Sequence, residues 1–349
     1  MTDRNAGKRL RSWALLCAVL AATPVQAAPC LRGINLAGAE FGSASGKYGT
    51  NYIYPSDKTV LYFAQKGMNV IRLPFKWERL QPKLNGPLNE DELNRIKETV
   101  DQASSRGLTT ILDPHNYAGY NQIKLGEGDV TAAAFANFWA RLAPHFAGRA
   151  DVVYLLMNEP AGITAATWLE AINAGIAAIR KAGADNLVMV PGTIWTGASH
   201  WFDRQPGGSN AEVLRNVRDP QNRFVFDIHQ YMDSDYSGTH QTCPRVQDAI
   251  KALEGVSGWF RQYGYAGFLG EFGGTGSPDC LDGLARIADY INSQGDTWIG
   301  WSAWAAGPWW GDYPLSLQPK EGVDKPQLKV LEPYIRDDGL EMPACPARK

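Results

Sequence analysis

Short apolar runs alternate along this chain with longer segments in which apolar residues recur at helical spacing. The runs are rich in β-branched and aliphatic residues, as buried strands are, and the segments between them are typical of the helices of βα units. Eight runs are predicted to be strands: Leu31–Leu36, Asn69–Pro74, Thr109–Pro114, Val152–Met157, Leu187–Pro191, Phe224–Gln230, Gly267–Glu271 and Trp298–Ala303.

The amphipathic segments predict helices over Asn89–Arg106, Ala132–Phe146, Ala165–Ala182, Gln247–Tyr263, Leu281–Gln294 and Pro326–Ile335. Several begin after an Asp, Asn or Thr cap and end at a glycine, as helices commonly do. Residues 192–209 are rich in Gly, Trp and Ser and are expected to form a long loop. Eight βα units without a linker or repeat predict an α/β fold of one domain, a (β/α)8 TIM barrel.

The N-terminus has the pattern of a signal peptide. Basic residues precede an apolar run from Trp13 to Ala22, and a small-residue cleavage pattern ends at Ala27. The apolar run is shorter than the roughly 20 residues that cross a bilayer. Residues 1–27 are therefore predicted to be removed, and residues 28–349 to be a secreted, soluble protein that does not associate with membranes.

The cysteines predict disulfides in an oxidising compartment. Of the five cysteines, Cys17 lies in the predicted signal peptide, so four remain and allow three pairings. The pairs Cys243 with Cys280 and Cys30 with Cys345 are favoured, because the second pair would tie the two ends of the mature chain together. No CxxC motif or Cys/His cluster indicates zinc, and neither a metal nor a cofactor is expected.

Charge and aromatic content narrow the class of partner. The formal net charge of −2 leaves no basic surface for nucleic acid, so the substrate is expected to be neutral. The chain has 12 Trp and 14 Tyr residues, and such rings line sugar-binding clefts, where they pack against the C–H faces of a pyranose. Many of these rings also serve the core. A monomer is expected.

Polar residues follow the ends of the predicted strands, which is where barrel enzymes carry their active sites. These residues are Arg72, His115, Asn116, Asn158, Glu159, His229, Tyr231 and Glu271, with Trp301 and Trp304 on the last strand. The first strand offers Asn35 and no His-x-His motif, which argues against a metal-dependent amidohydrolase.

Glu159 and Glu271 have the positions that glycoside hydrolysis requires of two carboxyl groups. Glu159 follows a long apolar strand, where burial would raise its pKa as a general acid requires. Glu271 ends another strand and is expected to face Glu159 across the barrel mouth, where it would attack or stabilise the anomeric carbon. Either glutamate alone is compatible with a structural ion pair, but the two together favour catalysis.

Neighbouring side chains have predicted supporting roles. Arg72 is expected to keep Glu271 ionised, and Tyr231 to donate its phenol proton to the same carboxylate. Asn158 is expected to bind the sugar 2-hydroxyl.

The two histidines are assigned to positioning. His115 and His229 are expected to orient the reacting sugar or Glu159, although a strand-end histidine such as His115 also occurs as a buried structural residue. His229 and Tyr231 are two residues apart on a strand, so they point to the same face.

Two motifs resemble a known family: residues 157–160 (MNEP) resemble the acid/base motif, and residues 270–274 (GEFGG) the nucleophile motif, of glycoside hydrolase family 5. Residues 72–75, 113–117, 227–231 and 304–311 look like further strand-end segments of that family, and residues 32–42 resemble its fungal and bacterial endoglucanases. The resemblance runs from Cys30 to the last predicted helix.

This resemblance implies a retaining, metal-independent endo-β-1,4-glucanase that acts on β-glucan polysaccharide or oligosaccharide. Glu271 would be the nucleophile and Glu159 the acid/base. Trp304, rather than Trp301, would line the subsite of the reacting sugar; further cleft residues would be Trp309, Trp310, Trp195 and Trp201. The alternatives are a β-mannanase, β-1,3-glucanase or xyloglucanase on the same fold, and a non-catalytic carbohydrate-binding barrel.

Overall fold

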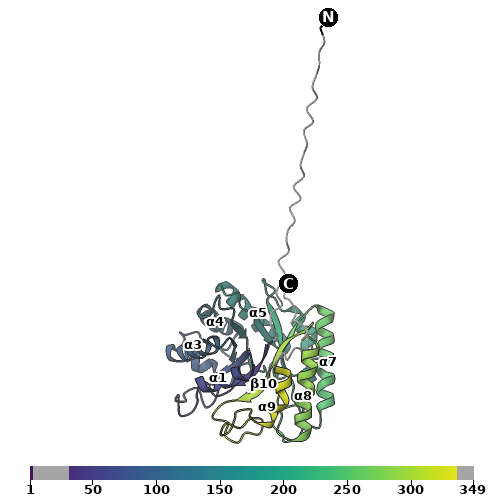
Figure 1. The fold of residues 1–349 in the computed structure, drawn as a ribbon. Coiled ribbons are helices and arrows are strands. Elements are labelled where there is room, and N and C mark those ends of the chain that lie inside the picture. Colours follow the sequence, from purple (N-terminus) through teal and green to yellow (C-terminus); the bar gives the residue numbers. More distant parts are fainter. Residues whose placement is uncertain (3–30, 336–349) are drawn as a thin grey trace.

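The computed structural model describes residues 1–2 and 31–335, and eight of its strands close into a parallel barrel. Around the barrel the order is β1, β2, β3, β6, β7, β8, β9 and β10, which confirms the predicted fold (Figure 1). The strands are β1 (Leu31–Leu36), β2 (Val70–Phe75), β3 (Thr109–Pro114), β6 (Val152–Leu155), β7 (Val188–Pro191), β8 (Phe224–His229), β9 (Gly267–Glu271) and β10 (Trp298–Ala306). A hairpin of β4 (Gly119–Tyr120) and β5 (Ile123–Lys124) follows β3.

Helices surround the barrel, with α1, α3, α4 and α5 on one side and α7, α8 and α9 on the other (Figure 1). Their bounds are α1 (Asp57–Gln65), α2 (Trp77–Leu80), α3 (Glu90–Ser104), α4 (Ala132–Leu142), α5 (Ala165–Lys181), α6 (Asn210–Val213), α7 (Val246–Tyr263), α8 (Pro278–Ser293) and α9 (Pro326–Ile335). Within residues 31–335, no helix is long and apolar enough to cross a membrane.

Local chemistry explains where the predicted helices begin and end. The side chains of Asn89 and Thr164 accept the N-terminal N–H groups of α3 and α5, and Gly264 ends α7 with a φ of 70°. The helix predicted to reach Phe146 stops at Leu142 and continues as the 3-10 turn Ala143–His145. Proline at position 144 has no N–H to continue the α-helical ladder.

The interior of the barrel changes from apolar to charged toward its mouth. One cluster of buried apolar side chains comes from neighbouring strands and includes Val70, Ile111, Val225 and Phe268. Because alternate side chains of a strand share a face, the residues two positions further along also point inward. Those residues are Arg72, Asp113, Asp227 and Gly270, and the three charged ones are fully buried. A layer of buried charged side chains thus separates the apolar interior of the barrel from its mouth.

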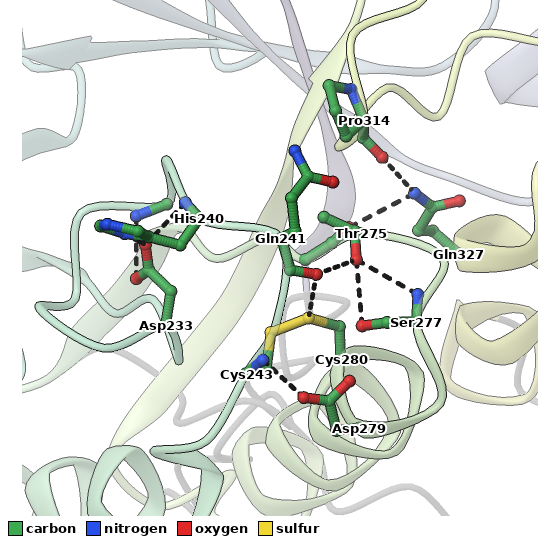
Figure 2. Close-up of a disulfide and its surroundings, with 12 residues drawn as sticks. Asp233, His240, Gln241, Cys243, Thr275, Ser277, Asp279, Cys280, Pro314 and Gln327 are labelled. Carbon is green, nitrogen blue, oxygen red and sulfur yellow. Dashed lines mark hydrogen bonds and ion pairs between the residues drawn. A yellow bond between two sulfur atoms is a disulfide. The ribbon is translucent and has the colours of Figure 1, made fainter.

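A disulfide ties the loop after β8 to helix α8. Cys243 and Cys280 are bonded, and the Cys243 N–H also donates to the Asp279 carboxylate at 2.7 Å (Figure 2). In the same region the Thr275 hydroxyl donates to the Gln241 carbonyl. This is one of the two favoured pairs. The other, Cys30 with Cys345, lies outside the described residues.

Replacing both Cys243 and Cys280 by serine is expected to lower the free energy of unfolding by about 2–4 kcal/mol, because the bond closes a long loop in the unfolded chain. Urea-induced unfolding of the double variant, compared with the oxidised and the reduced parent protein, would measure the loss. An unchanged unfolding midpoint in all three samples would show that this bond contributes little.

Candidate active site

Glu159 and Glu271 approach each other at the C-terminal mouth of the barrel. One carboxylate oxygen of each lies within 4.8 Å of the other and of a ring nitrogen of His229. Carboxyl groups of retaining glycosidases lie about 5–5.5 Å apart, whereas inverting enzymes keep about 6.5–9.5 Å between them to admit a water. The observed spacing falls below the range of the inverting enzymes.

Glu271, the last residue of β9, is buried and held at both oxygens. Arg72 Nη1 donates to Oε1 at 2.8 Å, and the Tyr231 hydroxyl donates to Oε2 at 2.8 Å. An arginine and a phenol in these positions fix the orientation of the carboxylate through two hydrogen bonds. These are the two contacts that the sequence predicts for this side chain.

Arg72 links Glu271 to the rest of the site. Its Nη1 also donates to Asn35 Oδ1 at 2.7 Å and lies 3.0 Å from Asp113 Oδ2, while Nη2 donates to Asn158 Oδ1 at 2.5 Å. Burial opposes the charge, but the carboxylates of Asp113 and Glu271 outweigh it and raise the pKa of Arg72. Arg72 is therefore a permanent cation at the centre of the barrel.

Glu159 is less enclosed than Glu271 and has a strained backbone. Its side chain is 15% exposed, and its φ of 41° lies in the left-handed region that a glutamate seldom adopts. Burial raises the pKa of Glu159; the hydrogen bond from His229, 2.7 Å away, opposes the rise, and the charge of Glu271 adds to it. A carboxyl group that keeps its proton to a higher pH suits a general acid.

His115 lies on the other side of Asn158. Its Nδ1 is 2.7 Å from Asp113 Oδ2, its Nε2 is 3.1 Å from the Asn158 amide nitrogen, and its ring stacks on Trp304. Burial lowers the pKa of His115, but the Asp113 carboxylate outweighs it and leaves the pKa raised. The amide of Asn158 is thereby held between His115 and Arg72.

A pocket of about 480 Å³ opens beside Glu159. Its lining includes Tyr117, Glu159, Trp195, His229, Tyr231 and Tyr236. Trp195 is 54% exposed and sits at the centre of three consecutive residues with left-handed backbone, from Ile194 to Thr196. The Trp195 N–H donates to the Pro160 carbonyl, so this turn is tied to the segment that carries Glu159.

Comparison with known proteins identifies the family to which the chain belongs. The model of the cellulase family, glycosyl hydrolase family 5, matches residues 29–307. The chain belongs to this cellulase family.

Three of its relatives match over nearly their whole length. Endo-beta-1,4-glucanase A of Emericella nidulans is 36% identical over 332 residues, 93% of this chain and 99% of the relative. The structure of XacCel5A in complex with cellopentaose is 45% identical, with a TM-score of 0.86, and the match covers 88% of this chain and 99% of that one. Endoglucanase Cel5A of Pseudomonas stutzeri in complex with cellobiose is 33% identical, with a TM-score of 0.81, over 91% and 96% of the two chains.

Within this family 5 fold, the tryptophans of the last strand and the loop after it differ in exposure. Trp301 is fully buried and donates to Asn292, whereas Trp304 stacks on His115 and its peptide bond to Ala305 is cis. Trp309 is exposed, and one face of Trp310 is covered by Tyr313 at 4.3 Å between ring centroids. The geometry agrees with the choice of Trp304, and Trp309 is the more open of the two predicted platforms.

Trp201 was expected in the cleft, and this expectation is wrong. Its side chain is 0% exposed and packs edge-on against Phe226 and Trp259 beneath the loop after β7. A Cβ at Gly192 would lie 2.6 Å from the Trp201 ring, so that glycine makes room for it. Nothing local in the sequence distinguishes Trp201 from Trp195. Trp195 lies within the left-handed turn Ile194–Thr196, whereas Trp201 directly follows the 3-10 turn Ala198–His200.

Alanine at these two positions is expected to separate stability from binding. Trp201→Ala should lower the free energy of unfolding by about 3–5 kcal/mol, as large core deletions do. Trp195→Ala should leave stability unchanged and raise KM for cello-oligosaccharides by about 2- to 10-fold, the value of one aromatic contact. Thermal unfolding and steady-state kinetics on both variants would test this, and a destabilised Trp195→Ala variant would contradict it.

Asn116 does not point into the site. Its Oδ1 accepts the Trp77 N–H at 2.7 Å, and its amide nitrogen donates to Glu78, so the side chain holds the start of α2. Two buried carboxylates, Asp113 and Asp227, begin the segments 113–117 and 227–231, and no role is predicted for them from the sequence. The signal for them was the repeated Asp-x-His pattern, which places each aspartate on the same strand face as its histidine.

Two groups among the described residues have oxygen and nitrogen atoms spaced as metal ligands: Glu159 with His229 and Glu271, and Asp233 with Asp235 and His240. In the first group Arg72 already supplies the positive charge at Glu271. In the second group Asp233 accepts backbone N–H groups from Gly238, Thr239 and His240, which organise the loop before Cys243 (Figure 2).

Proposed function

We propose that this chain is a retaining endo-β-1,4-glucanase that hydrolyses internal bonds of cellulose and related β-glucans, with Glu271 as nucleophile and Glu159 as acid/base. The observation that carries the proposal is the spacing of the two carboxylates, whose oxygens lie within 4.8 Å of each other. That spacing is shorter than the roughly 6.5–9.5 Å that inverting enzymes keep between the two carboxyl groups to admit a water beside the sugar.

The environments of the two glutamates support different roles in a double displacement. Glu271, ionised beside Arg72, attacks the anomeric carbon, and the glycosidic C–O bond breaks as Glu159 gives its proton to the departing oxygen. A covalent glycosyl ester on Glu271 results. Glu159, now a carboxylate, removes a proton from water, the water oxygen attacks the anomeric carbon, and Glu271 leaves.

The remaining side chains support recognition of a sugar chain. Asn158, fixed by Arg72 and His115, is placed to bind the 2-hydroxyl of the reacting sugar, and Trp304 offers an apolar wall beside it. The pocket with Trp195 lies on the acid/base side, where the departing part of the chain would sit. One relative is an endo-beta-1,4-glucanase, and two related structures hold cellopentaose and cellobiose, which favours glucan as the substrate over mannan.

Secretion as a monomer after removal of residues 1–27 belongs to the same proposal and is supported by the signal-peptide pattern of the sequence. Intact mass of the exported protein would test the cleavage, because it should fit a chain that begins at residue 28. Size-exclusion chromatography with light scattering would test the monomer.

The activity is tested by following viscosity and reducing ends together on soluble carboxymethyl cellulose, with mannan and xylan in parallel. A steep fall in viscosity with few new ends, on cellulose alone, is the expected result. Cutting of mannan but not of cellulose would move the substrate to β-mannan. NMR of the first-formed product should show the β-anomer, and an initial α-anomer would exclude retention.

A further inference from the structure

Asp227 is a buried carboxylate with unusual surroundings. It is 0% exposed, and within the described part of the chain neither its oxygens nor the facing His229 Nε2 make a hydrogen bond of good geometry. Buried polar groups are almost always hydrogen-bonded, so a buried carboxylate without a hydrogen bond requires an explanation. The basic side chain within ion-pair distance of Asp227 is that of His229, whose Nε2 lies 3.2 Å from Asp227 Oδ2.

His229 faces carboxyl oxygens through both of its ring nitrogens. Nδ1 lies 2.7 Å from Glu159 Oε1 and 3.6 Å from Glu271 Oε2, while Nε2 faces Asp227. A neutral imidazole has one N–H donor and one acceptor nitrogen, and only the imidazolium presents a proton on each side. When Glu159 and Asp227 are both ionised, a neutral ring can donate to only one of them, and the geometry then favours the charged ring.

The other Asp-x-His pair is built differently. Asp113 is shared between His115 and Arg72, and the second nitrogen of His115 faces the Asn158 amide rather than a carboxylate. Asp113 thus has a permanent cation besides its histidine. Asp227 has no arginine or lysine within 4.0 Å among residues 31–335, so the two aspartates are not equivalent.

Position 270 keeps the space that Asp227 needs. A Cβ at Gly270 would lie 2.1 Å from Asp227 Oδ1, so a side chain there and the aspartate in its present position exclude each other. Gly270 directly precedes Glu271 on β9. The absence of a side chain at position 270, next to the proposed nucleophile, therefore leaves the space that the Asp227 carboxylate occupies.

From these contacts we propose that Asp227 is a positioning residue that holds His229 as an imidazolium between Glu159 and Glu271. The inference rests on the proposed function. When Glu159 gives its proton to the departing oxygen, the imidazolium Nδ1–H stabilises the carboxylate that forms. No proton leaves His229 in either step, so the ring acts as a fixed positive charge.

The charges around His229 agree with this role. It faces Asp227 on its own strand, Glu271 on β9 and Glu159 after β6, with Tyr231, Arg72 and His115 in the same site. Burial opposes a charge on the ring, but the Glu271 and Asp227 carboxylates outweigh it and raise the pKa of His229 to about 10. A raised histidine pKa means that the charge persists through neutral pH and is lost only in alkaline solution.

Removing the charge of Asp227 is expected to change the pH profile. In Asp227→Asn the pKa of His229 falls, Glu159 loses a charged donor, and the pKa of Glu159 rises further. The alkaline limb of kcat/KM on cello-oligosaccharides should move upward by about one pH unit, with lower kcat at the optimum. The variant should cleave an aryl cellobioside, whose leaving group needs no proton, with a smaller loss of rate than it shows on cello-oligosaccharides.

The decisive experiment is side-chain ¹⁵N NMR of histidine-labelled protein, read together with those pH profiles. The chain has five histidines, so His229→Gln identifies the signal by its absence. The parent protein should show His229 doubly protonated at pH 7, and Asp227→Asn should show it titrating near neutrality. A neutral His229 in the parent protein overturns the inference, even if the variant fails to fold, and so does an unshifted pH profile in a folded variant. Because the NMR signal does not depend on turnover, a parent protein that cuts no glucan would reject the proposed function alone.

Discussion

The Glu271→Gln variant is expected to lose endoglucanase turnover by about 10⁴-fold or more while it still binds cello-oligosaccharides. An amide cannot form the glycosyl ester, but it keeps the shape of the carboxylate, and its oxygen can still accept the Arg72 hydrogen bond. The size of the loss follows from removing the group that forms the covalent intermediate rather than one that positions the sugar. Reducing-end release from carboxymethyl cellulose gives the rate, and calorimetry with cellopentaose gives the affinity.

Glu254→Gln is the matched control for this variant, because Glu254 is an exposed glutamate on α7, away from the barrel mouth. It should retain full activity. If Glu271→Gln kept a rate within tenfold of the parent enzyme, Glu271 would not be the nucleophile, and the role would have to pass to another carboxylate of the site.

Glu159→Ala is expected to lower the rate on cellulose by about 10²- to 10⁴-fold, since the departing sugar then leaves without a proton. An aryl cellobioside with a dinitrophenolate leaving group should still form the glycosyl-enzyme intermediate. That intermediate should accumulate, because no base activates water, and azide should restore turnover and give the β-glycosyl azide.

The two glutamates are separated by the configuration of the azide product. Azide entering in place of Glu271, in Glu271→Ala, attacks the substrate directly and gives the α-glycosyl azide, whereas azide acting on the intermediate in Glu159→Ala gives the β-product. The same azide configuration from both variants would refute the assignment of roles.

The pH dependence of the parent enzyme also tests the role of Glu159 as the acid/base. Burial and the charge of Glu271 raise the pKa of Glu159 above its ordinary value, so the acid stays protonated to a higher pH. Activity is expected to fall as the pH rises through that value, and the alkaline limb of kcat/KM should disappear in Glu159→Ala when the dinitrophenyl substrate is used.

Several contacts follow from strand periodicity and were predictable residue by residue. Side chains at the C-terminal ends of parallel strands meet at one mouth, so Arg72, Tyr231 and Glu271 were expected together, and they make the two hydrogen bonds predicted for them. The separation of Glu159 from Glu271 in space was not available from the sequence, because it depends on the closure and tilt of the barrel.

Loop residues were the least predictable part. Trp195 and Trp201 lie six residues apart in the same loop, and the residues around them are similar in composition. Trp195 nevertheless lines the pocket, whereas Trp201 is part of the core. Asn116 follows His115 directly, yet it serves the start of α2. In both cases the outcome depends on backbone angles set by distant contacts, such as the hydrogen bond from Trp195 to Pro160.

By itself, the sequence determined the eight-stranded barrel, its helices and the set of polar residues at its mouth, because apolar periodicity and strand ends are local properties of the chain. The tertiary structure alone decided which of those residues touch, which oxygens Arg72 and His229 face, and that the buried Asp227 carboxylate has His229 as its ion-pair partner. Those facts arise from side chains far apart along the chain, which meet only when the sheet closes, and no local pattern encodes the distances between them.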